Sequence, residues 1–168
     1  MITRRRMLSG VSIVGLTALG FGLTSARSAT PEGSFEITKT EEEWRAILTP
    51  EQFQVLRQAG TERPFTSPLL DEHGEGTFAC AGCDLPLYSS ETKYDSRTGW
   101  PSFWAPIVGS VLPRPDTSYG MVRTELICRR CGSHLGHLFN DGPAPTGMRH
   151  CINGLALVFH PAGEDVMG

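Results

Sequence analysis

The pattern of hydrophobic and polar positions changes at Arg63, and the part before it contains two helix starts. Thr40 and Thr49 each stand three residues before a glutamate or glutamine, which is the spacing of a helix-capping box. A short stretch with an apolar side follows each start, Pro50 suits the first position of a helix, and Gly60 suits its end. The pattern therefore predicts two short helices in succession that cover one side of a core.

Beyond that point the apolar runs are short and lie between glycines and prolines, which is typical of strands bounded by turns. In residues 122–128 an apolar set alternates with a set that includes Arg123 and Glu125, as on a half-buried strand. No long helical period appears in this part. We therefore predict a mainly β protein, a small antiparallel barrel or sandwich-like domain preceded by the two helices. The expected strands are 76–80, 85–90, 111–115, 120–128, 134–139 and 152–160.

Residues 1–29 have the order of an export signal. Arginines come first, an apolar and glycine-rich stretch follows, and small residues come last. Thr3, the next arginines and Leu8 also fit the twin-arginine pattern. The alternative is a membrane anchor formed by an uncleaved signal, but a span needs about 20 apolar residues and this stretch is shorter. We expect export by the twin-arginine route to the periplasm, a linker at 30–39 and one domain at 40–164.

Charge separates the signal from the rest of the protein. The chain of 168 residues carries 15 basic and 18 acidic residues, for a formal net charge of −3. The first 29 residues hold four arginines and no acid, so 11 basic and 18 acidic residues remain and the rest carries −7. Phosphate backbones bind clustered lysine and arginine, so this charge argues against nucleic acid as a partner. Nothing in the composition indicates an assembly, and we expect a monomer.

Four of the five cysteines form two CxxC units, Cys80 with Cys83 and Cys128 with Cys131. Each turn lets two thiolates point at one ion, and two such turns complete a tetrahedral site. The 44 residues between the units exceed the gap of a compact zinc finger, so the metal would join two hairpins of a larger domain. Such a site has no open coordination position, and we expect it to hold structural zinc.

Two disulfides, a redox-active CxxC and iron are the alternatives for these four cysteines. An exported protein makes disulfides a serious rival, because they persist in oxidising compartments. The twin-arginine route carries folded proteins, however, so a metal can be loaded in the reducing cytoplasm before export.

Cys151 has no CxxC partner, which makes it the candidate nucleophile. By strand alternation Arg149 and Asn153 share its face, where a guanidinium lowers the pKa of a thiol and an amide donates hydrogen bonds. His134 and His137 stand in a strand-like run before it. The alternatives are a buried strand cysteine and histidines that are satisfied in the core or at the surface.

The chain resembles the methionine-R-sulfoxide reductase family in several stretches, namely "EEWRAILTPEQFQVLRQAGTERPFT", "KYDSRTGWPSFWAPI", "RTELICRRCGSHLGHLFNDGPAPTGMRHC" and "RHCIN" followed by "GLALVF". These motifs, together with the two CxxC units, occur in the family's order. The similarity extends from about Phe35 to Pro161 without large gaps.

The resemblance implies a β-tent type of domain with zinc on the four paired cysteines, and reduction of methionine-R-sulfoxide in oxidised proteins. Cys151 matches the family's catalytic cysteine. Trp100 matches the tryptophan that packs on the substrate's methyl group, although on residue pattern alone it is equally well a core aromatic. The other site residues that the resemblance implies, some catalytic and some substrate-binding, are His134, His137, Asn153, Phe139, Arg149 and Asp141.

The chemistry of a sulfoxide suits these residue types. Its sulfur is electrophilic, and its oxygen leaves poorly unless protonated, so the site needs a thiolate and an acid. A histidine of near-neutral pKa supplies the proton. The products are methionine and a sulfenic acid on Cys151.

Thr98 departs from the pattern of many relatives, which carry a second, resolving cysteine in that position. No cysteine is left over once four are assigned to metal, so we expect an external thiol, such as a thioredoxin-like protein, to reduce the sulfenic acid. The alternative function is a zinc-stapled β-fold that binds a ligand without catalysis. Such a module has no need of a thiol among histidines, so Cys151→Ser would leave its ligand binding intact.

Overall fold

The computed structural model describes residues 35–163. The predicted signal at 1–29, the first half of the predicted linker at 30–39 and the predicted last domain residue, 164, lie outside the described residues. Within 35–163 no helix is both long and apolar enough to cross a membrane. Antiparallel strands dominate this region, as predicted.

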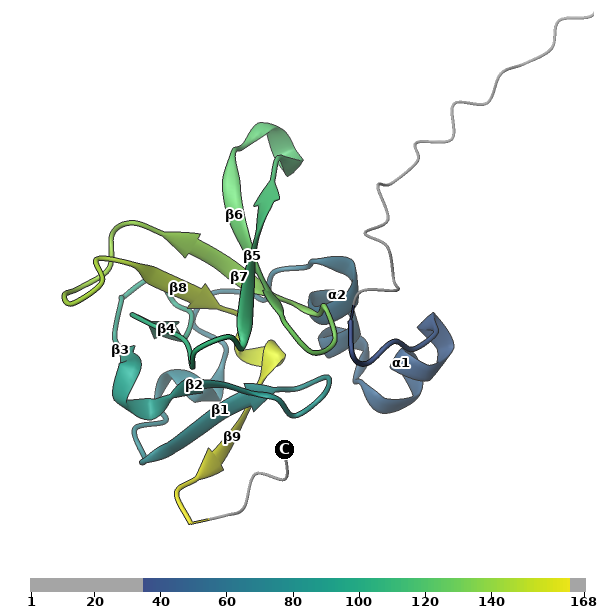
Figure 1. The fold of residues 1–168 in the computed structure, drawn as a ribbon, viewed down its shortest axis with the longest axis horizontal. Helices are drawn as coiled ribbons and strands as arrows, with labels where there is room; N and C mark the ends of the chain where they lie inside the picture. The colour runs from purple at the N-terminus through teal and green to yellow at the C-terminus, as the bar shows by residue number, and fades with distance from the viewer. Residues whose placement is uncertain (1–34, 164–168) are drawn as a thin grey trace, which may run out of the picture. The chain divides into compact units, whose positions relative to one another are not determined.

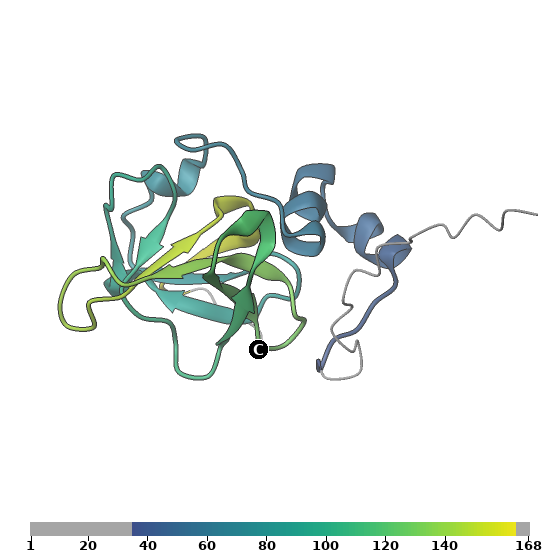
Figure 2. The same cartoon turned by 90° about the horizontal axis from the view of Figure 1, so that it is seen from above.

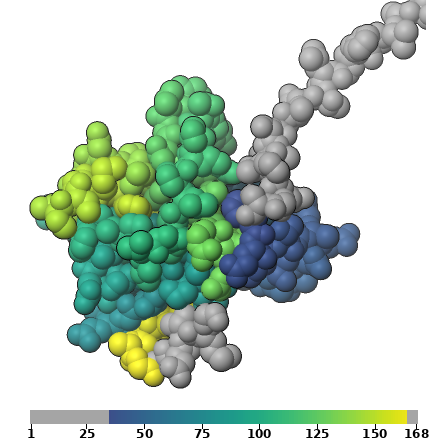
Figure 3. All heavy atoms as spheres, viewed as in Figure 1, coloured from purple at the N-terminus to yellow at the C-terminus, as the bar shows by residue number. Residues whose placement is uncertain are grey.

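Both predicted helices are present. Helix α1 spans Glu41–Ile47 and α2 spans Pro50–Gln58. Each begins with the predicted capping box, in which the threonine hydroxyl and the residue three positions on satisfy each other's backbone N–H groups. Helix α2 ends through Ala59 in the left-handed conformation (φ 53°), one residue before the predicted stop. The apolar sides bury Trp44 and Leu56 against the domain, and both helices lie at one end of the two sheets (Figures 1, 2 and 3).

Nine strands form two antiparallel sheets in the described residues (Figure 1). The smaller sheet has the order β2-β1-β9 and the larger one β3-β4-β8-β7-β6-β5. The strands of the smaller sheet are β1 Gly76–Cys80, β2 Pro86–Ser89 and β9 Leu157–Pro161. Those of the larger sheet are β3 Lys93–Tyr94, β4 Ser102–Phe103, β5 Val111–Asp116, β6 Arg123–Cys128, β7 His134–Phe139 and β8 Arg149–Ile152.

The single strand expected at 152–160 is wrong, because β8 and β9 are separate strands in different sheets. A short 3-10 turn, Gly154–Ala156, lies between them. Its first backbone N–H groups, at Gly154 and Leu155, donate to the buried carboxylate of Glu62. This long-range contact ends the strand, and residues 152–160 alone give no sign of it.

Strand register places the polar residues of the larger sheet in one row. Directly paired residues of an antiparallel sheet point to the same face. The row that crosses the sheet consists of Tyr94, Ser102, Cys151, His137, Glu125 and Arg114. Their strand neighbours, among them Phe103 and Ile152, point the other way into the core, where the ring of Phe103 stacks on Tyr88 at 4.3 Å. One face of this sheet therefore carries a row of polar side chains, and the other face is hydrophobic.

Candidate active site and metal centre

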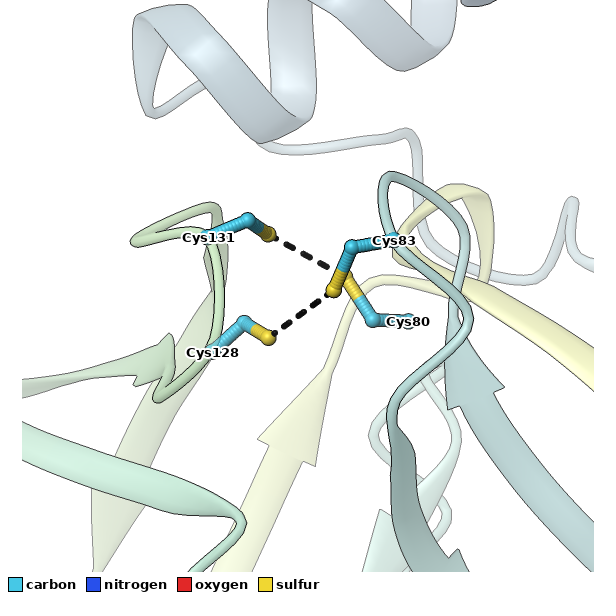
Figure 4. A group of neighbouring side chains, drawn as sticks. All are labelled: Cys80, Cys83, Cys128 and Cys131. Atoms are coloured by element: carbon cyan, nitrogen blue, oxygen red, sulfur yellow. Dashed lines mark hydrogen bonds between the residues drawn. The ribbon is translucent and has the colours of Figure 1, made fainter. Parts of the chain in front are cut away.

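The four paired cysteines come together in one cluster, formed by the turn after β1 and the turn after β6 (Figure 4). All four sulfurs lie within 4.8 Å of one another, with Cys80 to Cys131 at 3.8 Å and Cys83 to Cys128 at 3.5 Å. A regular tetrahedron of 2.3 Å metal–sulfur bonds has edges of about 3.8 Å, so the cluster fits a tetrahedral metal ion. A disulfide needs about 2.05 Å, and all four cysteines are free thiols here.

The surroundings of the cluster also suit a cation. Hydrogen bonds among the cysteine sulfurs, followed by burial, raise the pKa of the Cys80 thiol well above its usual value. Four thiols packed this closely, three of them buried, cannot all ionise without a positive charge among them, and a metal ion would supply it. Gly132 holds the second turn at φ 68°, which favours glycine. Helix α2 closes the outer side, because Arg57 donates a hydrogen bond to the carbonyl of Cys131 at 3.1 Å.

Cys151 lies on β8, at a hollow of about 150 Å³ on the polar face of the larger sheet. Five of the eight predicted active-site residues line this hollow, namely Cys151, His137, Asn153, Trp100 and Phe139. The remaining lining residues are Thr61, Arg123 and Gly136. The structure thus brings together the lone cysteine, a histidine and two aromatic rings from strands and loops far apart in sequence.

Burial controls the charge of Cys151. It raises the pKa of the thiol above the usual value, while the positive charge of Arg149 and hydrogen bonds from Thr98 and Arg149 lower it by less. The predicted closeness of Arg149 is confirmed. The pKa of the thiol nevertheless shifts in the opposite direction to the predicted lowering, because the desolvation of a half-buried sulfur outweighs one guanidinium.

His137 is held by a carboxylate that no sequence pattern singles out. Its Nε2 lies 2.8 Å from an oxygen of Asp116, and both side chains are 14% exposed. Arg123 donates to the same oxygen at 2.7 Å. Burial acts to raise the pKa of Asp116, but hydrogen bonds from Ser118, His137 and Arg123 outweigh it and hold that pKa well below its usual value. Because Asp116 is therefore an acceptor, His137 donates through Nε2 and exchanges its second proton at Nδ1.

Burial lowers the pKa of His137, and the hydrogen bond with Asp116 acts to raise it. Behind His137 lies His134, which is buried and is not among the residues that line the hollow. The two rings are 5.4 Å apart, and Nδ1 of His134 lies 2.7 Å from the carboxylate of Glu125. The larger sheet thus supports two carboxylate–imidazole pairs side by side.

Glu62 fixes Trp100 at the edge of the hollow. The indole N–H of Trp100 donates to the backbone carbonyl of Glu62 at 3.1 Å, and the backbone N–H of Glu62 donates to the side-chain oxygen of Asn153 at 3.0 Å. Asn153 also donates from its amide nitrogen to the carbonyl of Leu135 at 3.0 Å. Asn153 lines the hollow, and its observed hydrogen bonds join the Glu62 segment to β7.

Arg149 and Asp141 form a bidentate pair with contacts of 2.8 and 2.9 Å. The guanidinium of Arg149 also lies over the ring of Phe139, 4.3 Å from its centroid. Neither Arg149 nor Asp141 lines the hollow, so they act on it through Cys151 and Phe139.

Sequence reasoning missed Thr61, which lines the hollow, and the residues that hold the predicted ones, namely Asp116, Arg123, Glu125 and Glu62. A partial signal existed for two of them, since Arg123 and Glu125 alternate with apolar residues on a predicted strand. Such alternation is typical of a polar outer face, whereas Glu125 is 6% exposed and faces the histidines. Asp116 and Glu62 reach the site only through tertiary contacts.

Comparison with known proteins gives a consistent result. The SelR domain family matches residues 48–161. The chain is 56% identical over 124 residues to "Peptide methionine sulfoxide reductase MsrB" of Thiobacillus denitrificans, covering 73% of this chain and 94% of that protein. The protein of the same name from Pseudomonas putida strain W619 is 58% identical over 127 residues, with 75% and 96% covered. The one from Methanosarcina barkeri is 53% identical over 133 residues, with 79% and 94% covered.

Proposed function

Because this chain belongs to the SelR domain family, whose compared members are peptide methionine sulfoxide reductases MsrB, we propose that it reduces methionine-R-sulfoxide in oxidised proteins to methionine. The observation that carries the proposal is the hollow in which Cys151, His137 and Trp100 meet. A thiol, a titratable imidazole and a flat apolar wall are the three groups that the chemistry of a sulfoxide requires.

Cys151 is the nucleophile. Its sulfur attacks the sulfoxide sulfur, the oxygen passes from the substrate to Cys151, and methionine leaves. The substrate sulfur is reduced by two electrons and Cys151 is oxidised to a sulfenic acid, with no net gain or loss of protons. A neutral thiol at rest is therefore compatible with the reaction, provided that its proton reaches the sulfoxide oxygen.

His137 moves that proton. It is paired directly with Cys151 across β7 and β8, so Nδ1 takes the proton from the thiol and gives it to the departing oxygen. During this transfer His137 is an imidazolium, and the carboxylate of Asp116 stabilises its positive charge. His134 and Glu125 support the ring of His137 from behind.

Trp100 and Phe139 form the apolar part of the hollow and hold the methyl group of the substrate. The oxygen then has to lie on the side of His137 and Asn153. Fixing the methyl group on one side and the oxygen on the other admits one configuration at sulfur, and we assign it as R. Arg149, tied to Asp141, acts on the ionisation of Cys151.

An external thiol regenerates the enzyme. Thr98, which lies within hydrogen-bonding reach of Cys151, has a hydroxyl where a resolving thiol would have to be. The reductant is a thioredoxin-like protein or another thiol, which attacks the sulfenic sulfur, releases water and leaves a mixed disulfide for a second thiol to resolve.

Zinc is the metal that we assign to the cluster of Cys80, Cys83, Cys128 and Cys131, because four thiolates in a tetrahedron are its preferred structural site. Bound there, it would cross-link the turns after β1 and β6. Held by these four cysteines, the ion would have no open coordination position, and no step of the reaction would involve it.

Export by the twin-arginine route to the periplasm, as a monomer, completes the proposal. The arginines at 4 and 5 and the short apolar stretch after them support it. Replacing both arginines by lysine should leave the protein in the cytoplasm of fractionated cells. A variant that still reaches the periplasm would refute this route.

The decisive assay uses a methionine peptide with separated R and S sulfoxides, the protein and dithiothreitol, and counts the methionine formed. Only the R form should be reduced, and Cys151→Ser should abolish turnover. Equal rates on both forms, or none on either, contradict the proposed function.

A further inference from the structure

A second and larger hollow adjoins the one at Cys151. The hollow at Cys151 measures about 150 Å³, whereas the cleft beside it measures about 530 Å³. Ligand sites commonly measure about 300–1,000 Å³, so the smaller hollow suits one side chain and the cleft suits a longer segment. Trp100 lines both, so a chain whose side chain enters the hollow passes this residue into the cleft.

Phe65 lines the cleft and leaves its ring in solvent. It is 70% exposed, and its φ of 62° is an uncommon conformation for an aromatic residue. Its backbone N–H donates to the carbonyl of Gly99 at 2.8 Å. A Cβ on Gly99 would come within 2.9 Å of the Phe65 ring, so glycine there lets the ring lie against the Trp100 loop. An exposed aromatic in a strained conformation beside an active site is a feature of ligand contacts.

The far wall of the cleft is held in place by hydrogen bonds. The ammonium of Lys93 donates to the carbonyls of Leu70 and Glu72 at 3.1 and 2.8 Å, which fixes the segment 70–74. The hydroxyl of Tyr94 is buried and has no hydrogen-bond partner among residues 35–163. Tyr94 lines the cleft and belongs to the same row of the sheet as Cys151. The hydroxyl itself is closed off from the cleft, so Tyr94 contributes its ring to this wall.

We propose that this cleft is a subsite for the polypeptide segment next to the oxidised methionine. The proposal rests on the proposed function, in which the methionine sulfoxide side chain occupies the hollow at Cys151. The flanking backbone then runs past Trp100, and a flanking side chain packs on Phe65. The site is thereby built for sulfoxides within polypeptides and draws little benefit from the free amino acid.

Single-turnover measurements without a reductant test the subsite. The reduced protein is mixed either with an N-acetylated, C-amidated pentapeptide that has methionine-R-sulfoxide at its centre or with free methionine-R-sulfoxide, and methionine is counted over time. For Phe65→Ala we expect the second-order rate constant on the pentapeptide to fall about tenfold, which corresponds to about 1.4 kcal/mol of lost binding. The rate constant on the free amino acid should change less than about twofold.

Tyr119→Ala is the matched control. Tyr119 is also an exposed aromatic with a positive φ (89% exposed, φ 55°), but it lies in the turn between β5 and β6 and lines neither hollow (Figure 1). Both rate constants should stay at the wild-type level. His73→Trp is a second test, because His73 is an exposed lining residue and the larger ring would narrow the cleft. It too should slow only the pentapeptide.

The outcomes separate the subsite from the proposed function. Equal effects of Phe65→Ala on the pentapeptide and the free amino acid, or a similar effect of Tyr119→Ala, would overturn the subsite. So would variants that keep their single-turnover rates and lose only recycling by a thioredoxin-like protein, since the cleft would then bind the reductant. Wild-type protein that reduces neither sulfoxide would instead sink the proposed function, and the subsite with it.

Discussion

Asp116→Asn tests whether a carboxylate behind His137 makes the reaction fast. Asparagine keeps the size of the side chain and removes its negative charge. The native oxygen lies 2.8 Å from His137 Nε2 and 2.7 Å from a nitrogen of Arg123. The amide oxygen can still accept the hydrogen bonds from His137 and Arg123, whereas the backbone N–H of Ser118, which donates to the other carboxylate oxygen at 2.9 Å, loses its acceptor. The contact with His137 should therefore survive while the electrostatic support of the imidazolium is lost.

The size of the effect follows from that distance. Coulomb's law with an effective dielectric constant of about 20 gives about 6 kcal/mol between unit charges 2.8 Å apart. Desolvation and the nearby charge of Arg123 cancel most of this attraction, and hydrogen bonds to charged groups contribute about 1.5–3 kcal/mol net. At about 1.4 kcal/mol per factor of ten, Asp116→Asn should slow oxygen transfer by about 10- to 100-fold.

The pH dependence distinguishes this role from simple distortion. Burial already lowers the pKa of His137, and loss of the carboxylate lowers it further. Near pH 7 His137 is mostly neutral in both proteins, so the full deficit should appear. At a pH below the pKa of His137 in both proteins the ring is already charged, the carboxylate no longer makes a difference, and the two rates should converge. Single-turnover rates on an R-sulfoxide peptide across the acidic range measure this.

Asp84→Asn is the matched control, because Asp84 also holds a histidine, His160, at 2.7 Å but lies away from the hollow. It should leave the rate unchanged at every pH. A deficit in Asp116→Asn that stays constant down to the acid limit would refute the reasoning, since it would indicate misplacement of His137 instead of lost charge stabilisation.

Three further predictions concern the metal, the recycling step and the core. Cys131→Ser should lower the bound metal from about one equivalent to well under half, and it should lower the Tm by at least about 10 °C. Cys151→Ser should keep the metal. A wild-type protein that contains no metal would contradict the proposed site. After one turnover without reductant, mass spectrometry should find one added oxygen on Cys151 of the wild-type protein. In Thr98→Cys it should find a disulfide between the new cysteine and Cys151. An internal disulfide in the wild type would exclude recycling by direct attack of an external thiol. Burial lowers the pKa of His150 to about 4, below its value in the unfolded chain. The folded state therefore binds fewer protons than the unfolded state, and the protein should lose about 1–2 kcal/mol of stability as the pH falls from about 7 to about 5. His150→Phe should be less stable than the wild type at pH 7, because the hydrogen bond between Tyr88 and His150 is lost. Between pH 7 and pH 5, however, its free energy of unfolding in urea should fall by less than that of the wild type. An equal fall in both proteins would show that other groups cause the acid destabilisation.

The elements that could be predicted from sequence are those encoded by neighbours along the chain. Both capping boxes lie within four residues, and each CxxC unit fits one turn, so local pattern was enough to find the helices and the metal ligands. Five of the predicted active-site residues meet in one hollow. Strand alternation indicates two of them, Cys151 and Asn153, and the family resemblance indicates all five. The strand at 134–139 was predicted with both of its ends correct.

The groups that hold the site could not be predicted, because their partners are distant in sequence. Glu62 ends β8 through contacts made 92 and 93 residues away. Asp116 on β5 meets His137 on β7 across the intervening strand β6, a contact that depends on a register that no local pattern fixes. The direction of the pKa shift of Cys151 was mispredicted for a related reason. The position of Arg149 follows from alternation, but the burial of the sulfur depends on the whole fold.

The raised pKa of Cys151 is consistent with the reaction that we propose. Oxygen transfer needs the thiol proton at the sulfoxide oxygen, and His137 lies beside the thiol to carry it. A site built to keep a thiolate at rest would leave Arg149 unpaired, whereas here two hydrogen bonds to Asp141 offset much of its charge. A thiol is also a far weaker target for other oxidants than a thiolate. In the mechanism that we propose, Cys151 therefore ionises only when a sulfoxide oxygen is present to receive the proton.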